Sequence, residues 1–365
     1  MTVTSYGSSS RLCVLAWPAR KNSTHNPYQK LLYDSVEETG FARVSEFDKK
    51  AAFNAKAPDI LHIHWPDAFL AAGAGWRFWP RYIALRFYLD YIHLRGTKIV
   101  WTAHNLRRAG QRNSERMDRY FWPWFLRRLD GVIFMTDASA RQARKTEPAL
   151  ATLPFDVIPH GHYKPVLPAE TRLDAPRMTT PEAIFFGSIT AYKNAWLLLQ
   201  SFLDLPAGTA RLHICGKPST REPDERLEGM LLSLPPDKAS AVRIDARFLS
   251  DDALATAIRE ADLAVFPYKD VLNSGAAIFA LSAGRPILAS DTALFRELQN
   301  HVGPQWVMLI SGPLDGKQLA QALQRARALR LDSAIPDLSR LDWEEIGQRT
   351  TAFYHRLVET EDNGR

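Results

Sequence analysis

The chain alternates short apolar runs with longer segments of helical pattern, and this alternation limits the fold more than any other feature. Residues 261–291 show it best, with an apolar run at 261–267, a polar turn, an all-apolar segment at 276–283 and a second apolar run at 287–289. A helix that is apolar on every side is a buried helix. Strands that alternate with helices build a parallel sheet covered on both faces. We therefore predict an α/β protein with parallel, doubly wound sheets.

The same pattern occurs in two blocks, on either side of a stretch at 166–182 that is rich in proline and polar residues and has no period. A chain of 365 residues is also too long for one typical core. We predict two Rossmann-like domains, 1–165 and 183–343, joined by a linker at 166–182 and facing each other across a cleft. A final helix within 344–365 is expected to pack back on the first domain. Strands are predicted at 11–17, 41–47, 59–65, 98–102, 131–135 and 156–158, and then at 183–187, 211–215, 242–245, 261–267 and 287–289.

The composition is that of an ordinary soluble protein, with a hydrophobic fraction of 46%. No apolar run approaches the roughly 20 residues that a membrane span requires, and the first residues lack a signal-peptide pattern. We therefore expect a cytoplasmic protein. Cys13 and Cys215 each lie in a strand-like run, which predicts buried, reduced thiols. We find no spacing typical of a metal site and expect none.

The positive charge is concentrated in residues 71–130, which hold 12 Arg and Lys against 4 Asp and Glu. Arginines that alternate with aromatic residues suit an anionic membrane surface, where rings lie among the headgroups and guanidinium groups meet phosphates. We predict that this segment docks the protein on the inner leaflet and that it binds no nucleic acid. Nucleic-acid binding, or a solvated basic helix with its aromatics in the core, remain the alternatives. The segment holds five of the ten tryptophans: Trp76, Trp79, Trp101, Trp122 and Trp124.

Polar side chains of the first block cluster just after predicted strands. In a parallel sheet these positions share one edge, where ligands bind. A single histidine after a strand is more often a packing or turn residue, but several such loops at one edge favour a site. The residues are His25, Asp67, His104, Asp137 and His160.

The predicted helix at 276–283 begins at Ser274-Gly275. The first N–H groups of a helix have no partner inside it and carry the positive end of the helix dipole, which suits a phosphate. An ordinary strand–helix–strand crossover with a glycine at the turn is the alternative for this stretch alone.

Several motifs of the second block occur in the order and spacing of a known family: Phe186-Gly187-Ser188 with Lys193-Asn194, then His213 to Gly216, Pro267-Tyr268, Ser274-Gly275 and Gly284-Arg285-Pro286. The block resembles family-4-like, nucleotide-sugar-dependent glycosyltransferases of the GT-B fold. In the first block, HWPD and WTAHN are similar to bacterial exopolysaccharide mannosyltransferases of the xanthan type. Members of that group transfer mannose from GDP-mannose to a lipid-diphosphate-linked oligosaccharide.

The resemblance implies a nucleotide-sugar donor, GDP-mannose as the best guess, and no separate cofactor. The leaving diphosphate would be neutralised by Lys193 and by amides at the start of the 276–283 helix rather than by a metal ion. Lys217, Arg247 and Phe248 would lie near the nucleobase. The implied donor-binding residues are Gly187, Ser188, Lys193, Gly216, Asn273, Ser274, Gly275 and Ala276, with His160 and His162 as further donors to the diphosphate.

The chain departs from the family at one informative point. Retaining members usually carry two glutamates in this region, but the matching positions are Val271 and Phe279, and the nearest acid is Asp270. An inverting displacement fits better, and it needs one general base from the first domain. Asp67 and His104 are the leading candidates, with Glu115 and Asp137 behind them.

Together these points predict a peripheral, cytoplasmic-face glycosyltransferase that acts on a lipid-linked acceptor. A retaining enzyme that uses a UDP-sugar is the alternative within the family. A sugar-nucleotide epimerase or a non-catalytic carbohydrate-binding protein is the alternative from another class. Thermal stabilisation of the protein by GDP, UDP or ADP distinguishes these alternatives.

Overall fold

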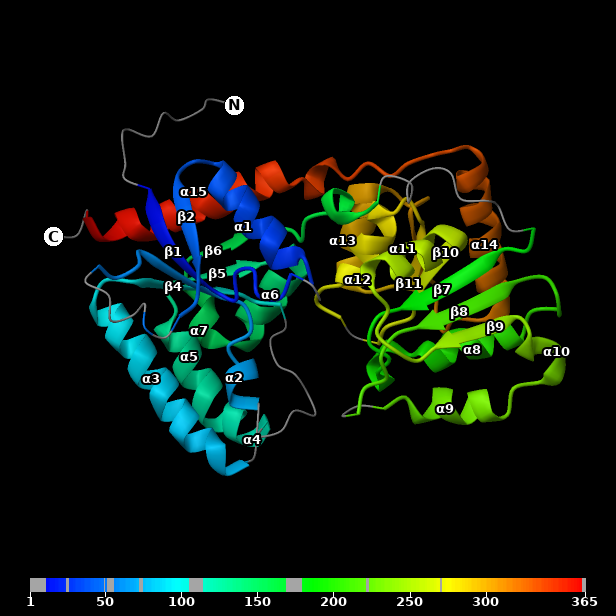
Figure 1. Ribbon diagram of the computed structural model, residues 1–365, viewed down its shortest axis with the longest axis horizontal. Coiled ribbons are helices and arrows are strands. Elements are labelled where there is room, and N and C mark those ends of the chain that lie inside the picture. The colour runs from blue at the N-terminus through cyan, green and yellow to red at the C-terminus, as the bar shows by residue number, and fades with distance from the viewer. Residues whose placement is uncertain are drawn as a thin grey trace. The chain divides into compact units, whose positions relative to one another are not determined.

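The computed structural model describes residues 11–23, 26–48, 50, 56–71, 75–104, 114–168, 179–220, 223–269 and 271–362. The chain divides into two compact units (Figure 1). Unit 1 comprises Met1–Gly161 with Leu341–Arg365, and unit 2 comprises His162–Arg340. The chain thus enters unit 2 after Gly161 and leaves it after Arg340. The sequence predicted that the first domain ends at residue 165 and the second at residue 343.

Unit 1 is a six-stranded, all-parallel sheet in the order β2-β1-β3-β4-β5-β6. Helices α1 and α15 cover one face, and α3 and α5 cover the other (Figure 1). Its strands are β1 (Leu12–Trp17), β2 (Ala42–Glu46), β3 (Ile60–Ile63), β4 (Lys98–Thr102), β5 (Gly131–Phe134) and β6 (Phe155–Val157). Its helices are α1 (Tyr28–Glu38), α2 (Ala68–Ala71), α3 (Phe78–Leu94), α4 (Ser114–Arg116), α5 (Trp122–Arg128), α6 (Asp137–Thr146), α7 (Pro148–Ala151) and α15 (Trp343–Asp362).

Unit 2 is a second six-stranded parallel sheet, in the order β12-β11-β10-β7-β8-β9. Its strands are β7 (Glu182–Phe186), β8 (Arg211–Cys215), β9 (Val242–Asp245), β10 (Leu263–Phe266), β11 (Ile287–Ser290) and β12 (Val307–Ile310). Its helices are α8 (Ala195–Leu203), α9 (Glu225–Leu232), α10 (Pro236–Ala239), α11 (Asp251–Glu260), α12 (Gly275–Ser282), α13 (Ala293–Val302) and α14 (Gly316–Leu331). The predicted fold class, with two doubly wound parallel sheets, is confirmed.

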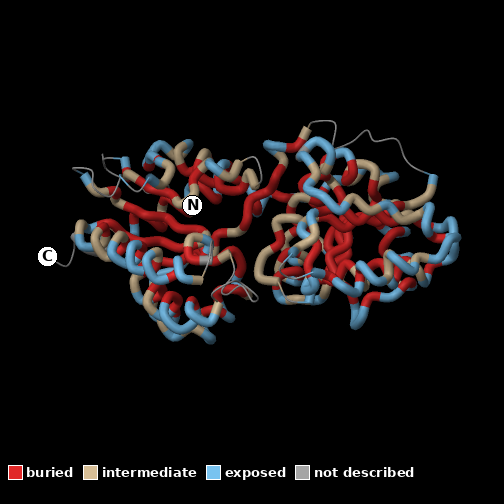
Figure 2. The backbone as a smooth tube through the Cα atoms, turned by 60° about the horizontal axis from the view of Figure 1, so that its bottom comes forward, coloured by how far each residue is buried: buried red, intermediate tan, exposed pale blue. Residues whose placement is uncertain are grey.

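The central strands of both sheets are buried along most of their length (Figure 2). The edge strands β6 and β9 are half-buried or exposed. The core beneath the unit 1 sheet is rich in aromatic residues, among them Phe78, Trp101, Phe121 and Phe125. Residues 114–128 form α4, a π-helical turn at Met117–Phe121 and then α5. Pro123 explains the wide turn, because proline has no N–H for the carbonyl four residues before it.

Each sheet has one point where the strand order reverses. In unit 1, β1 lies between β2 and β3, and in unit 2, β7 lies between β8 and β10. Loops that leave two such neighbouring strands run in opposite directions and open a crevice at the carboxyl edge of the sheet, where ligands bind in doubly wound folds. The topology therefore singles out the loops after β1 and β3 in unit 1 and after β7 and β10 in unit 2.

The two cysteines are free thiols, as predicted. Cys215 is buried, and burial raises the pKa of its thiol to about 12. Cys13 is only half-buried, so the prediction of a fully buried thiol is wrong there. It is the second residue of β1, near the amino end of the sheet.

Candidate functional site

The loops after β7 and β8 cross at two glycines. Gly187 has φ +109° and Gly216 has φ +148°, which are conformations that other residues rarely adopt. A Cβ atom on Gly216 would lie 1.7 Å from the carbonyl oxygen of Gly187, so no side chain fits there. These two predicted donor-site residues therefore let two backbones meet at the carboxyl edge of unit 2.

Lys193 follows in a 3₁₀ turn at Ala191–Lys193. Its ammonium nitrogen lies 5.3 Å from the ring centroid of Tyr268, and a Cβ atom on Gly187 would be 3.2 Å from it. Burial lowers the pKa of Lys193 from its ordinary value of 10.5 to about 8. The absent side chain of Gly187 thus leaves room for a poorly hydrated cation beside the loop, as an anion-binding site requires.

Asn194 joins the two loops at the strand-order reversal. It adopts a left-handed conformation with φ 52°, which asparagine tolerates better than most residues. Its Nδ2 donates to the carbonyl of Pro267 (2.9 Å), and its Oδ1 accepts from Trp196 Nε1 (3.2 Å). The Lys269 N–H also donates to the Tyr192 carbonyl (2.9 Å). Lys193 is therefore held against the loop that leads to α12.

Helix α12 begins where predicted. Buried Ser274 caps it, because its Oγ accepts from the Ala277 N–H (3.2 Å). Gly275 and Ala276 in the first turn are half-buried, as is Asn273 before the cap. Phe279, the residue at the usual glutamate position, packs against Tyr163 and Phe186, with ring centroids 5.2 and 6.1 Å away.

Other features of unit 2 lie near these loops. Ser188 is exposed, and the buried hydroxyl of Thr190 has no hydrogen-bond partner in the described part of the chain. Lys217, Arg247 and Phe248 are exposed and follow β8 and β9. A pocket of about 360 Å³ opens between the start of α8 and the loops after β10, β11 and β12, and its lining includes Asn194, Pro267, Tyr268, Lys269, Asp291 and Thr292.

At the carboxyl edge of unit 1, β3 and β4 are neighbours, and so are the segments that carry Asp67 and His104. Asp67 is buried directly before α2. His104 is half-buried, and its ring lies on that of Trp65 with centroids 4.8 Å apart. Its Nε2 is 2.9 Å from His64 Nδ1.

The other polar residues predicted at this edge are placed differently. Asp137 and Glu115 are exposed, on α6 and α4, while His25 lies outside the described residues. His160 belongs to unit 1 and lies against Tyr28, with ring centroids 4.5 Å apart; the same tyrosine meets His104 edge-on at 5.4 Å.

His160 and His162 fall in different units. His160 Nδ1 donates to the Gly161 carbonyl (2.8 Å), and burial lowers the pKa of His160 to about 4, so its ring is neutral at pH 7. His162 is also buried. Their role toward a diphosphate stays a prediction.

Sequence reasoning missed a buried hydrogen-bonded series that ends at His104. His62 Nδ1 lies 2.7 Å from the hydroxyl of Tyr354 and 2.9 Å from that of Tyr33. The Tyr33 hydroxyl lies 2.6 Å from His64 Nε2, and His64 continues to His104. Burial lowers the pKa of His62 to about 3 and that of His64 well below its ordinary value. The alternation His-Ile-His on a buried strand was the available signal, since it places both rings on one face.

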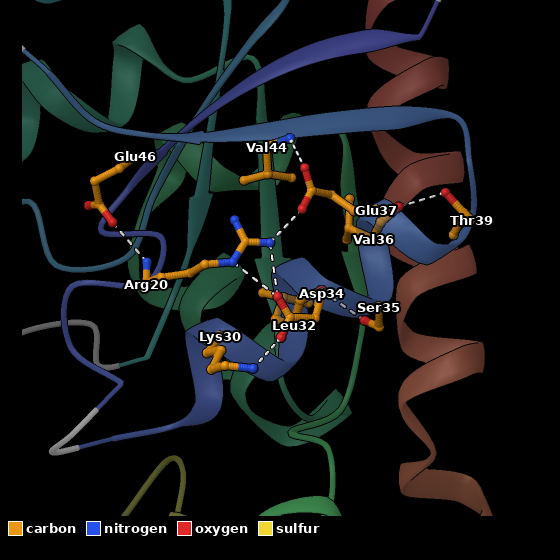
Figure 3. Close-up of polar contacts among 10 residues, drawn as sticks. All are labelled: Arg20, Lys30, Leu32, Asp34, Ser35, Val36, Glu37, Thr39, Val44 and Glu46. Atoms are coloured by element: carbon orange, nitrogen blue, oxygen red, sulfur yellow. Dashed lines mark hydrogen bonds and ion pairs between the residues drawn. The ribbon is translucent and has the colours of Figure 1, made fainter.

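The loop after β1, at the strand-order reversal of unit 1, is held by charged groups (Figure 3). The Arg20 guanidinium donates to Asp34 (3.0 Å) and Glu37 (2.6 Å) of α1. The Glu46 carboxylate accepts from the backbone N–H groups of Ala19, Arg20 and Lys21 at 3.1, 2.8 and 3.1 Å. Residues 19–21 of this loop are therefore held by contacts within unit 1.

The five tryptophans of residues 71–130 divide between surface and core. Trp76 and Trp79 are exposed, Trp124 is half-buried, and Trp101 and Trp122 are buried in the core of unit 1. In the described part of the chain, no helix combines the length and apolar character needed to cross a bilayer. No group of three or more histidine, cysteine or acidic side chains could hold a metal ion, again among the residues described.

Part of this chain matches a known protein family, and nearly all of it is similar to two curated proteins. Residues 180–328 match the family model described as glycosyl transferases group 1. Two curated relatives, both GDP-mannose:glycolipid 4-beta-D-mannosyltransferases of Xanthomonas campestris pv. campestris, are 29% identical over 351 residues, which cover 95% of this chain and 93% of theirs.

Solved structures resemble it across both units. Sucrose-phosphate synthase from Thermosynechococcus elongatus has a TM-score of 0.67 at 18% identity, covering 96% of this chain and 100% of that one. The catalytic domain of starch synthase IV from Arabidopsis thaliana, bound to ADP and acarbose, has a TM-score of 0.57 at 14% identity, covering 92% and 78%. At such identities the likeness is one of fold.

Proposed function

We propose that this chain, a GT-B glycosyltransferase with a group 1 glycosyl transferase domain over residues 180–328, transfers mannose from GDP-mannose to a lipid-diphosphate-linked oligosaccharide. The reaction inverts the anomeric carbon and needs no metal ion. The names of the two Xanthomonas relatives, which match nearly the whole chain, support the donor and the glycolipid acceptor. The reaction belongs to exopolysaccharide biosynthesis.

One observation carries the donor assignment: the Lys193 ammonium lies at the strand-order reversal of unit 2 beside Gly187. The first amides of α12 add donors on the same edge, as does the Thr190 hydroxyl, which has no hydrogen-bond partner among the described residues. As the bond from the anomeric carbon to the diphosphate breaks, its electron pair stays on the diphosphate. Lys193 and the helix start stabilise that charge.

Inversion is supported by Phe279. A phenylalanine packed on Tyr163 and Phe186 can neither accept a hydrogen bond from the donor sugar nor stabilise positive charge at its anomeric carbon. A single displacement then requires a base for the acceptor hydroxyl. Asp67 and His104, at the carboxyl edge of unit 1, are the candidates.

Thermal unfolding with GDP, UDP and ADP tests the donor. A ligand at 100 times its Kd stabilises the native state by about 2.7 kcal/mol. We expect GDP to raise the Tm most, with or without EDTA. Lys193→Ala should remove this shift, whereas Lys317→Ala, at an exposed position of α14, should keep it. A larger shift with UDP would favour the retaining alternative, and no shift with any nucleoside diphosphate would overturn the donor assignment.

Incubation with GDP-mannose and a lipid-diphosphate oligosaccharide extract tests the reaction itself. We expect a product one hexose heavier with a β-linked mannose, read by mass spectrometry and by NMR of the anomeric carbon. An α-linkage would contradict inversion. A product formed without the lipid acceptor would contradict glycosyl transfer to it.

We propose that α3 docks the protein on the cytoplasmic face of an anionic membrane, where it reaches the lipid-linked acceptor. This helix is apolar on two opposite sides: Phe78, Leu85, Leu89 and Ile92 pack into the core. On the other side lies what we name the outer stripe, Trp76, Trp79, Ile83, Phe87 and Leu94. Trp79, Ile83, Phe87 and Leu94 recur along α3 at spacings of four, four and seven, so they share one helix face. Trp76 lies in the 3₁₀ turn directly before the helix.

Exposed apolar stripes of this extent mark interaction surfaces. Phe87 is 66% exposed and Leu94 is 84% exposed. Arg77 lies over the Trp76 ring at 5.0 Å, and exposed Arg86, Arg116 and Arg119 add positive charge to the same segment. Apolar rings flanked by guanidinium groups fit a lipid surface with anionic headgroups.

Sedimentation with vesicles tests this surface. The double variant Ile83→Glu/Phe87→Glu should lower binding to phosphatidylglycerol-containing vesicles and leave the GDP-induced Tm shift unchanged. Leu232→Glu on α9, where the leucine is 91% exposed, is the matched control and should bind as the parent does. If the double variant binds these vesicles as well as the parent protein does, the membrane proposal is wrong.

A further inference from the structure

In the buried series of unit 1, the contacts determine which group donates and which accepts each hydrogen bond. We name it the His–Tyr series: Tyr354, His62, Tyr33, His64 and His104, in the order of contact. It begins on α15, passes α1 and β3, and ends after β4. Its first four members are at most 1% exposed. A neutral histidine has one N–H and one lone pair, so each link constrains the next.

The first link is set by Tyr354. Its hydroxyl has a single hydrogen-bond partner within the described residues, His62 Nδ1 at 2.7 Å. If Tyr354 did not donate there, a buried O–H would be left without an acceptor, which is unfavourable. His62 Nδ1 is therefore the acceptor. The His62 proton lies on Nε2, which donates to Thr102 Oγ1 (2.7 Å).

The second link follows from the first. The one lone pair of His62 Nδ1 accepts from Tyr354, so the 2.9 Å contact between Tyr33 and His62 Nδ1 is left without a hydrogen bond of its own. Tyr33 therefore donates to its other partner, His64 Nε2, at 2.6 Å. His64 then carries its proton on Nδ1 and donates to His104 Nε2 (2.9 Å). Since burial lowers the pKa of both His62 and His64, neither holds an extra proton that would reverse the order.

We infer that the His–Tyr series holds neutral His104 with its proton on Nδ1 and its Nε2 engaged as an acceptor, so that His104 acts as a hydrogen-bond donor and Asp67 is the general base. The assignment of the base rests on the proposed glycosyl transfer. In that step the acceptor hydroxyl gives its proton to the Asp67 carboxylate while its oxygen bonds to the anomeric carbon. The bond to the diphosphate breaks, and His104 keeps its proton throughout.

Tyr354, His62, Tyr33 and His64 are accordingly positioning residues. Tyr354 determines the direction of the series, because its hydroxyl donates to His62 Nδ1, the nitrogen to which Tyr33 could otherwise donate. Without its hydroxyl, Tyr33 can donate to His62, His64 to Tyr33 and His104 to His64, which would move the His104 proton to Nε2. The C-terminal helix thereby controls the proton position on a residue at the edge of the sheet.

Nitrogen-15 NMR of the histidine rings tests the inference without any substrate. With His104 signals assigned by their loss in His104→Gln, we expect the Nδ1–H form for His64 and His104 and the Nε2–H form for His62. Tyr354→Phe should shift His104 toward the Nε2–H form. Tyr82→Phe, which removes another buried hydroxyl of unit 1, should leave all three unchanged. An Nε2–H form of His104 in the parent protein, or no change in Tyr354→Phe, would overturn the inference.

Transfer rates separate the two candidate bases. Loss of a general base lowers kcat roughly 10²–10⁴-fold, so Asp67→Asn should fall by that amount. His104→Gln keeps an N–H donor and should fall less than about 10-fold, with a greater loss in His104→Ala. A fall in His104→Gln as deep as that in Asp67→Asn would refute the donor role. If the parent protein transfers no mannose, the proposed function fails, while the NMR result still decides the tautomer.

Discussion

At the scale of single residues, Lys193 carries a charge that burial makes unfavourable. Its pKa is lowered to about 8 because burial removes water from the ammonium group. The ordinary value for lysine is 10.5. The unfolded chain therefore holds this proton more tightly than the native protein, so the charged ammonium destabilises the free enzyme below about pH 8. Such groups are typical of sites whose ligand supplies the missing counter-charge.

Lys193→Met should accordingly stabilise the ligand-free protein at pH 7. The pKa difference sets an upper limit of about 3 kcal/mol, and because Lys193 is half-buried we expect roughly 1–2 kcal/mol. The gain should shrink as the pH rises from 8 toward 10.5, because the lysine then loses its proton in both states. Urea unfolding at pH 7 and pH 10, with Lys317→Met as the exposed control, measures this. Lower stability of Lys193→Met at pH 7 would contradict the argument.

At the scale of elements, α15 is held against α1 by a close approach at one glycine. A Cβ atom on Gly347 would lie 2.4 Å from the carbonyl oxygen of Ser35 in α1. Gly229, inside α9, has nothing within 4 Å of the same position. Both lie inside helices, where alanine is favoured over glycine by about 1 kcal/mol. Their different surroundings determine whether an alanine at each position raises or lowers the stability of the protein.

Gly229→Ala should therefore stabilise the protein by roughly 0.5–1 kcal/mol. Gly347→Ala should destabilise it by about 1–3 kcal/mol, since a backbone oxygen cannot move aside as a side chain can. Urea unfolding of the pair measures both. Because Tyr354 is on the same helix, Gly347→Ala should also disturb its bond to His62. Parent-like stability of Gly347→Ala would show that the two helices can separate without cost.

At the scale of the whole molecule, the buried histidines are unevenly divided. In unit 1, burial lowers the pKa values of His62, His64 and His160. In unit 2, burial lowers the pKa of His213, against the opposing hydrogen bond to Asp245. Each of these groups takes up a proton on unfolding below pH 6.5, so the stability it contributes is lost as the pH falls from 6.5 toward the native pKa.

Mild acid should therefore open unit 1 before unit 2. Three such groups lower the free energy of unfolding by at most about 4 kcal/mol per pH unit, against about 1 kcal/mol for one group. Hydrogen exchange compared at pH 7 and pH 5 should show the larger loss of protection in the strands of unit 1. Earlier loss of protection in unit 2 would contradict the prediction.

Much of this molecule could be read from local patterns. Eleven of the strands were predicted, most of them from apolar runs, because burial in a parallel sheet needs only a short stretch of apolar residues. Helix α13 and strand β12 were not predicted, although Thr292, which caps α13, and the apolar spacing of Leu294, Leu298 and Val302 were available signals. Along α3, the sequence predicted the aromatic residues but not which would face the solvent, since both sides of that helix are apolar.

The sequence by itself predicted the alternating architecture, the two glycines and the lysine that we propose bind the donor, and the apolar helix that follows them. These depend on residues close together in the chain, whose conformation and burial follow from local pattern. Only the tertiary structure decided that Tyr354 meets His62, 292 positions away, and so where the proton of His104 lies. A hydrogen bond between buried side chains of separate elements requires both to be packed in place, and no local pattern encodes that distance.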